Sequence, residues 1–211
     1  MPTREIIPAI IGKNFTEVKD KIDEVGELTN WVHLDIADGK FVEDKTWAVA
    51  DDLNELGGRM KVEVHFMIER PEEVIADWVS VADRLIIHPE STDHLAEIMD
   101  LVKSTPTKLG FALLMNSDLS IVEPYIESLD VIQLMSINEL GHHGEPFEEK
   151  VLERIKTLRA KYPSVKISVD GGVTLETGKK CLDVGASQLA VGSALWNSDD
   201  FIKTLHDFQN L

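Results

Sequence analysis

Cysteine is almost absent from this 211-residue chain, which contains only Cys181. A single cysteine excludes an internal disulfide framework, and it excludes the zinc sites that closely spaced cysteine pairs form. Positive charge is scarce as well, since 21 lysines and arginines stand against 38 aspartates and glutamates, a formal net charge of -17. Because such a surface repels phosphate backbones and anionic lipid, we expect no nucleic-acid partner and no membrane partner.

Long hydrophobic runs are missing too. No apolar stretch approaches the roughly 20 residues that a membrane-spanning helix needs. The first residues lack the regions of a signal peptide, because Glu5 stands directly before Ile6 and Ile7. Together with the lone cysteine, this favours a cytoplasmic protein. Hydrophobic residues make up 43% of the chain and charged residues 28%, a globular composition, and the length favours one domain over residues 1–211.

Eight short runs rich in valine, isoleucine and leucine recur along the chain, separated by charged segments. They cover residues 6–11, 31–36, 62–67, 84–87, 108–114, 131–135, 166–169 and 188–191. Their nearly continuous apolar character is typical of parallel strands that are covered on both faces. The sequence therefore predicts eight strands of a parallel sheet.

The charged segments between these runs have helical spacing. In residues 15–25 and 148–160, apolar side chains recur every three or four positions. Residues that favour helix starts precede or open four of the segments: Asn14, Pro71–Glu73, Ser91 and Thr174. Eight strand–helix repeats favour a single (β/α)8 TIM barrel, an α/β fold, with a doubly wound open sheet as the structural alternative.

Polar residues stand near the carboxyl ends of three predicted strands, the end of a TIM barrel that carries active sites. His33 and Asp35 share one face of the second strand, because strand side chains alternate. His65 lies near the end of the third strand and Asp170 at the end of the seventh. Imidazole and carboxylate ligands suit zinc, iron, manganese or cobalt, so the set indicates a divalent metal site. Taken singly, each residue has a structural alternative, a buried hydrogen-bonded histidine or a helix-capping aspartate.

Glycines follow the last two predicted strands. Gly171 and Gly172 come after the seventh, and Gly192 with Ser193 after the eighth. Backbone N–H groups in such loops can bind a phosphate at a helix N-terminus, and TIM barrels often bind phosphate there. The alternative for either motif alone is a tight left-handed turn.

Three weaker features complete the predicted mouth of the barrel. Residues 138–146, after the sixth strand, are long enough for a mobile lid. Met67 and Met135, at strand ends, indicate an apolar floor or ordinary core. His88, at the end of the fourth strand, either contacts a ligand or packs.

At these motifs the chain resembles the ribulose-phosphate 3-epimerase family. The resemblance covers essentially the whole chain in order, through residues 7–10, 33–42, 64–71, 134–138, 169–173 and 192–194. It implies that one divalent metal is bound by His33, Asp35, His65 and Asp170. It also implies that backbone amides near Gly144, Gly171, Gly172, Gly192 and Ser193 hold the substrate's phosphate. We expect Met67 and Met135 to lie beside the substrate as well.

The activity implied by the resemblance is that of an isomerase of the pentose phosphate pathway, acting on a small ketose phosphate. It would convert D-ribulose 5-phosphate to D-xylulose 5-phosphate through a metal-stabilised enediolate, with Asp35 and Asp170 as catalytic acid and base on opposite faces of the substrate. We further expect a homo-oligomer.

The chain departs from the family pattern around the substrate. Ala9 stands where the family usually has serine, Lys40 where it usually has histidine, and residues 139–145 replace a lid of the Pro-Gly-Phe-Gly-Gly-Gln type. Two alternatives therefore stay open, an epimerase of a hexulose 6-phosphate such as allulose 6-phosphate, and a catalytically silent barrel that binds a sugar phosphate. Related barrel decarboxylases are disfavoured, because residues 63–67 lack their Asp-x-Lys-x-x-Asp arrangement.

Overall fold

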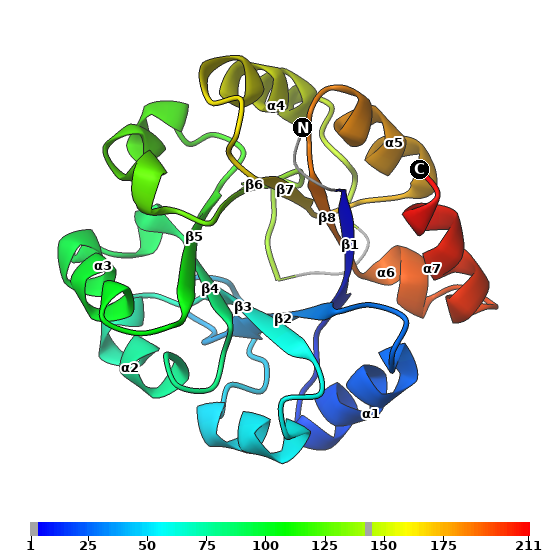
Figure 1. Ribbon diagram of the computed structural model, residues 1–211, viewed down its shortest axis with the longest axis horizontal. Helices are drawn as coiled ribbons and strands as arrows, with labels where there is room; N and C mark the ends of the chain where they lie inside the picture. Colours follow the sequence, from blue (N-terminus) through cyan, green and yellow to red (C-terminus); the bar gives the residue numbers. More distant parts are fainter. Residues whose placement is uncertain (1–3, 142–144) are drawn as a thin grey trace.

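The computed structural model describes residues 4–141 and 145–211. Its strands form a closed parallel barrel in chain order, with the last strand paired to the first (Figure 1). They are β1 (Glu5–Ile10), β2 (Trp31–Ala37), β3 (Lys61–Met67), β4 (Arg84–Ile87), β5 (Lys108–Leu113), β6 (Val131–Met135), β7 (Ile167–Asp170) and β8 (Gln188–Val191). The predicted TIM barrel is confirmed over the doubly wound sheet, because an open sheet would leave two strands unpaired at its edges.

Every strand begins and ends within one residue of its prediction. The alternation expected for β2 is also confirmed: Leu34 and Ile36 lie in the apolar layer that includes Val18 and Ile22 of the first helix. His33 and Asp35 point the other way, into the barrel. This division is what brings polar side chains of different strands together inside.

Helices surround the barrel (Figure 1). The α-helices are α1 (Phe15–Val25), α2 (Ile75–Trp78), α3 (Leu95–Lys103), α4 (Lys150–Lys161), α5 (Leu175–Asp183), α6 (Ser193–Trp196) and α7 (Phe201–Gln209). The helix over residues 15–25 has the bounds predicted for it, and Asn14 accepts a hydrogen bond from the N–H of Glu17 at 3.0 Å. Thr174 forms a capping box with Thr177 ahead of α5. In the described part of the chain, no helix is long and apolar enough to cross a membrane.

Among the described residues, four connections contain 3-10 helices: η1 (Ala50–Leu56), η2 (Pro71–Glu73), η3 (Pro89–Ser91) and η4 (Leu119–Ser128). The prediction that Ser91 starts a helix is wrong. Its hydroxyl donates back to the carbonyl of His88 at 2.8 Å, which closes a turn begun by Pro89, and α3 begins only at Leu95. The prediction at Pro71 is right about a helical turn, but that turn is η2 and precedes α2.

In most TIM barrels, valine, isoleucine and leucine fill the interior of the barrel. The interior of this barrel is more polar. Seven polar or charged side chains lie inside it with 0% exposure: His33, Glu63, His65, Arg84, Gln133, Ser168 and Gln188. Since buried polar groups need partners, these residues must satisfy one another across the barrel. The functional site is built on top of this polar layer.

Candidate metal centre and substrate pocket

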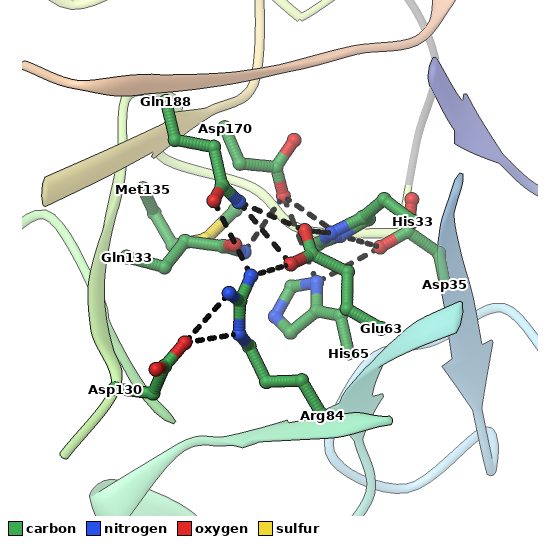
Figure 2. A network of polar contacts seen from close by, with 10 residues as sticks. All are labelled: His33, Asp35, Glu63, His65, Arg84, Asp130, Gln133, Met135, Asp170 and Gln188. Atoms are coloured by element: carbon green, nitrogen blue, oxygen red, sulfur yellow. Dashed lines mark hydrogen bonds and ion pairs between the residues drawn. The ribbon is translucent and has the colours of Figure 1, made fainter. Parts of the chain in front are cut away.

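Four of the predicted residues meet at the carboxyl end of the barrel. His33 and Asp35 come from β2, His65 from β3 and Asp170 from β7, and one potential ligand atom of each lies within 4.8 Å of the others. All four side chains are buried (Figure 2). Asp35 and His65 are direct register partners across β2 and β3, which explains why they meet. The structure thus brings the whole predicted ligand set together.

The orientation of the rings shows which nitrogens face the carboxyl groups. Asp35 Oδ1 lies 2.8 Å from His65 Nδ1 and 3.2 Å from His33 Nε2. Asp170 Oδ2 lies 3.6 Å and 3.9 Å from the same two nitrogens. The nitrogens that face the carboxylates are therefore Nδ1 of His65 and Nε2 of His33.

The two carboxyl groups have different proton affinities. Burial alone would raise the pKa of Asp35, but the neighbouring imidazoles of His33 and His65 hold it well below its usual range. Burial, and next the charge of Asp35, raise the pKa of Asp170 to about 6. The site therefore holds one carboxylate and, beside it, a carboxyl group that takes up a proton readily.

A divalent cation fits this donor set. Two buried carboxyl groups lie close together here, and a cation among them would offset their mutual repulsion, which contributes to the raised pKa of Asp170. First-row metals hold nitrogen and oxygen ligands at about 2.0–2.2 Å, so ligand atoms on one ion lie at most about 4.4 Å apart. A small contraction of the 4.8 Å cluster gives that geometry. The mixed imidazole and carboxylate set suits zinc, iron, manganese and cobalt alike.

A pocket opens above this cluster at the mouth of the barrel. Every predicted catalytic and substrate-side residue that the structure describes lines it: Asp35, Met67, Met135, Asp170, Gly171, Gly172, Gly192 and Ser193. His33 and His65 lie beneath, with 0% exposure. Gly144 lies outside the described residues.

The turn after β7 requires glycine. Gly171 has φ +104° and Gly172 φ +62°, in the left-handed region that side chains rarely adopt. A Cβ on Gly172 would also lie 3.0 Å from the carbonyl oxygen of Glu145 and 3.0 Å from the N–H of Phe147. The left-handed turn considered for this motif is therefore present, and both of its glycines line the pocket.

Among the residues that contact the cluster, Gln133 was missed and His88 was left undecided. Gln133 donates to Asp170 Oδ2 at 3.1 Å. The sequence offered a signal for it, because Gln133 stands two residues before Met135 and so shares its face of the strand. His88, with two predicted roles, has Nε2 at 2.8 Å from His65 Nε2 and does not line the pocket. Burial lowers the pKa of His88 to about 4, so the ring is neutral near pH 7. Glu145, in the segment after β6, also lines the pocket and was not singled out.

Solved structures similar to this chain share its fold. One is a mutant tryptophan synthase alpha-subunit from Pyrococcus furiosus, with a TM-score of 0.74 and 14% identity over the full length of both chains. Another is 3-hexulose-6-phosphate synthase from Salmonella typhimurium, with a TM-score of 0.72 and 15% identity, covering 98% of this chain and 97% of that one. At such identities the similarity concerns the barrel alone.

Sequence comparison goes further. A chloroplastic ribulose-5-phosphate-3-epimerase of Arabidopsis thaliana is 32% identical over 211 residues, covering 95% of this chain and 74% of that protein. A ribulose-phosphate 3-epimerase of Bacillus subtilis (strain 168) is 28% identical, covering 97% and 98%. The model of the ribulose-phosphate 3 epimerase family matches residues 5–196. The resemblance seen in the motifs is confirmed: this chain belongs to the ribulose-phosphate 3 epimerase family, a family of isomerases.

Proposed function

We propose that this protein is a metal-dependent 3-epimerase of a ketose phosphate, and that it interconverts D-ribulose 5-phosphate and D-xylulose 5-phosphate. The observation that carries the proposal is the pair Asp35 and Asp170. They line one pocket from β2 and β7, two strands that are not neighbours in the barrel. Inverting a carbon beside a ketone needs a base on one face and an acid on the other, and this pair supplies both.

The proton transfers follow from these two groups. One of the two carboxyl groups takes the proton from C3 as a carboxylate, and the other, protonated, returns one to the opposite face; their roles exchange in the reverse direction. His33, Asp35, His65 and Asp170 would hold the metal, which supplies a Lewis acid for the ketone oxygen. The buried hydrogen bond from Gln133 to Asp170 and the contact of His65 with Asp35 keep both carboxyl groups directed into the pocket.

The phosphate is proposed to bind at the backbone N–H groups of the turns after β7 and β8. Gly171, Gly172, Gly192 and Ser193 line the same pocket as the two aspartates. The net charge of -17 disfavours an anion at long range, so short-range donors have to provide the attraction. In this proposal the sugar lies between its phosphate, bound at these turns, and the two carboxyl groups.

Ala9 favours a second candidate, an epimerase of a hexulose 6-phosphate. Ala9 lines the pocket. A methyl group cannot form a hydrogen bond with a sugar hydroxyl, whereas the serine of the family pattern can. The sugar-facing wall of the pocket is therefore altered here. The six-carbon substrate would use the same two aspartates.

Deuterium exchange tests the proposal. Metal-reconstituted protein in deuterated water should place deuterium at C3 of ribulose 5-phosphate while xylulose 5-phosphate forms. Changing Asp35→Asn or Asp170→Asn should reduce epimerisation by roughly 10²–10⁴-fold, as expected for a lost acid or base. Asp183→Asn, which alters an exposed carboxylate of α5, is the control and should leave the rate unchanged.

The outcomes separate the candidates. Exchange limited to six-carbon substrates would support the hexulose phosphate epimerase and overturn the pentulose assignment. Sugar binding without any exchange, with metal restored, would indicate a silent barrel. Full turnover in both asparagine variants would overturn the two-aspartate mechanism.

A further inference from the structure

Beneath the metal centre lies a second group of buried side chains, which we call the Glu63 tier: Glu63 on β3, Arg84 on β4 and Gln188 on β8. All three have 0% exposure, and they meet in the middle of the barrel (Figure 2). The tier touches the metal centre at one point. Glu63 Oε1 lies 2.7 Å from Nδ1 of His33, the ring nitrogen opposite the one that faces Asp35.

Both oxygens of Glu63 are fully engaged. Gln188 Nε2 donates to Oε1 at 3.0 Å and to Oε2 at 3.2 Å. The Nη1 group of Arg84 donates to Oε2 in a close ion pair. Since His33 Nδ1 can only donate to a carboxylate, Oε1 accepts from His33 and Oε2 accepts from Arg84. The carboxylate therefore has one orientation, set from three strands.

Arg84 is itself held in place. Its Nε donates to Asp130 Oδ2 at 2.9 Å, its Nη2 lies 2.6 Å from the same oxygen, and its guanidinium carbon lies 4.4 Å from the centre of the Trp31 ring. A guanidinium has donors and no acceptor, and it keeps its charge at all ordinary pH values. Arg84 consequently requires an acceptor at the Oε2 position.

Stability does not account for this arrangement. Burying two charges costs desolvation free energy that their attraction often fails to recover, and apolar replacements of similar volume are often neutral or stabilising. Barrel interiors are ordinarily filled by branched apolar residues. A buried ion pair in contact with the ligand set therefore points to a role in arranging His33.

We propose that Glu63, fixed by Arg84 and Gln188, is a positioning residue for the metal centre: it accepts the Nδ1–H of His33 and so keeps the lone pair of Nε2 directed at the metal. Metal-bound histidines usually donate their other ring N–H to a carboxylate or carbonyl, which sets the tautomer and the ring orientation. The inference rests on the proposed metal-dependent function, because it concerns one of that site's ligands.

Glu63→Gln tests the proposal at nearly constant shape. Arg84 Nη1 would demand the amide oxygen, so the amide NH₂ would turn toward His33 and donate to Nδ1. The proton of His33 would then reside on Nε2, which could no longer bind a metal. Nitrogen-15 NMR of the neutral His33 imidazole should show Nδ1 protonated in the wild type and unprotonated in the variant. Metal affinity, measured with Zn²⁺ against a competing chelator, should fall about 10–100-fold.

The double variant Glu63→Gln/Arg84→Met gives a readout that a general loss of packing would not. Without Arg84 the amide can turn its oxygen to His33, which restores the Nδ1–H bond, so Zn²⁺ affinity should recover most of the loss. Ser168→Ala is the matched control, since Ser168 is buried in the same interior and its hydroxyl makes no hydrogen bond with the described residues. It should leave metal affinity unchanged.

Four results would decide the matter. Wild-type Zn²⁺ affinity in Glu63→Gln, or an Nδ1 that stays protonated there, would overturn the positioning role and leave the epimerase proposal standing. A double variant as weak as the single one, or weaker, would also overturn it. If the wild type binds Zn²⁺ and the expected losses occur without any C3 exchange, the positioning role stands and the proposed activity fails.

Discussion

Asp170→Asn should stabilise the metal-free protein at neutral pH, although it damages the proposed active site. The side chain is buried beside Asp35, and its pKa rises from the ordinary 3.8 to about 6 because of burial and then that neighbouring charge. Asparagine has nearly the same shape, cannot ionise, and can still accept the hydrogen bond from Gln133 that reaches Asp170 at 3.1 Å. The substitution thus removes the unfavourable charge and keeps the packing.

The magnitude follows from linkage between proton binding and folding. Each pKa unit corresponds to about 1.4 kcal/mol, so a rise from 3.8 to about 6 makes the ionised Asp170 side chain destabilising by about 3 kcal/mol. Between these two pKa values the folded state binds more protons than the unfolded state, so stability decreases as pH rises from about 4 to 6. Above pH 6 the penalty is constant. Asp170→Asn avoids it, and the gain should disappear as pH falls toward 4.

Urea unfolding with a chelator present, at several pH values from 4 to 8, measures this difference. For a domain of this length, about 3 kcal/mol corresponds to roughly 6–12 °C in melting temperature. Asp183→Asn at the surface is the control and should change neither the free energy of unfolding nor the melting temperature. An Asp170→Asn protein that is equally or less stable than wild type at pH 8, or whose gain is independent of pH, would refute the reasoning. Saturating metal should reverse the order, since asparagine is the weaker ligand.

Two further predictions concern the substrate. Gly172→Ala places a Cβ 3.0 Å from the carbonyl oxygen of Glu145 at a φ of +62°, which displaces the turn. KM for the phosphorylated sugar should therefore rise roughly tenfold or more while Zn²⁺ affinity stays constant. An unchanged KM would locate the phosphate elsewhere. Raising ionic strength from 0.01 to 0.15 M should increase kcat/KM in steady-state assays, because the screening length falls from about 30 to 8 Å and the net charge of -17 repels the anionic substrate less. A decrease would instead indicate that an attractive local field dominates.

Local chemistry made much of the fold predictable from the sequence. The apolar runs mark strands because parallel strands are buried on both faces, and Asn14 marks a helix start because its side chain satisfies a free N–H group. Ser91 shows the limit of such rules. It has the right chemistry for a cap, yet Pro89 had already begun a turn that used its hydroxyl.

The site likewise contains residues that the sequence predicts and residues that it does not. His33 and Asp35 are two residues apart on one strand, so alternation alone predicts that they share a face. The contact between Glu63 and Gln188 joins residues 125 positions apart and depends on how β3 and β8 face each other across the closed barrel. No pattern within either strand carries that information, so neither Glu63 nor its ion pair with Arg84 was foreseen.

The closure of the barrel has a consequence for synthesis of the chain. β1 pairs with β8 from Glu5 opposite Gln188 to Pro8 opposite Val191, and Trp196 then donates to the carbonyl of Ala9 at 2.5 Å. Since the N-terminus is made first, one edge of β1 has no barrel partner until nearly the whole chain has emerged. Unpaired strand edges recruit strands of other molecules. A chain that stops before residue 188 should therefore aggregate through the free edges of β1 and β7, and a chaperone would have to cover these edges until β8 arrives.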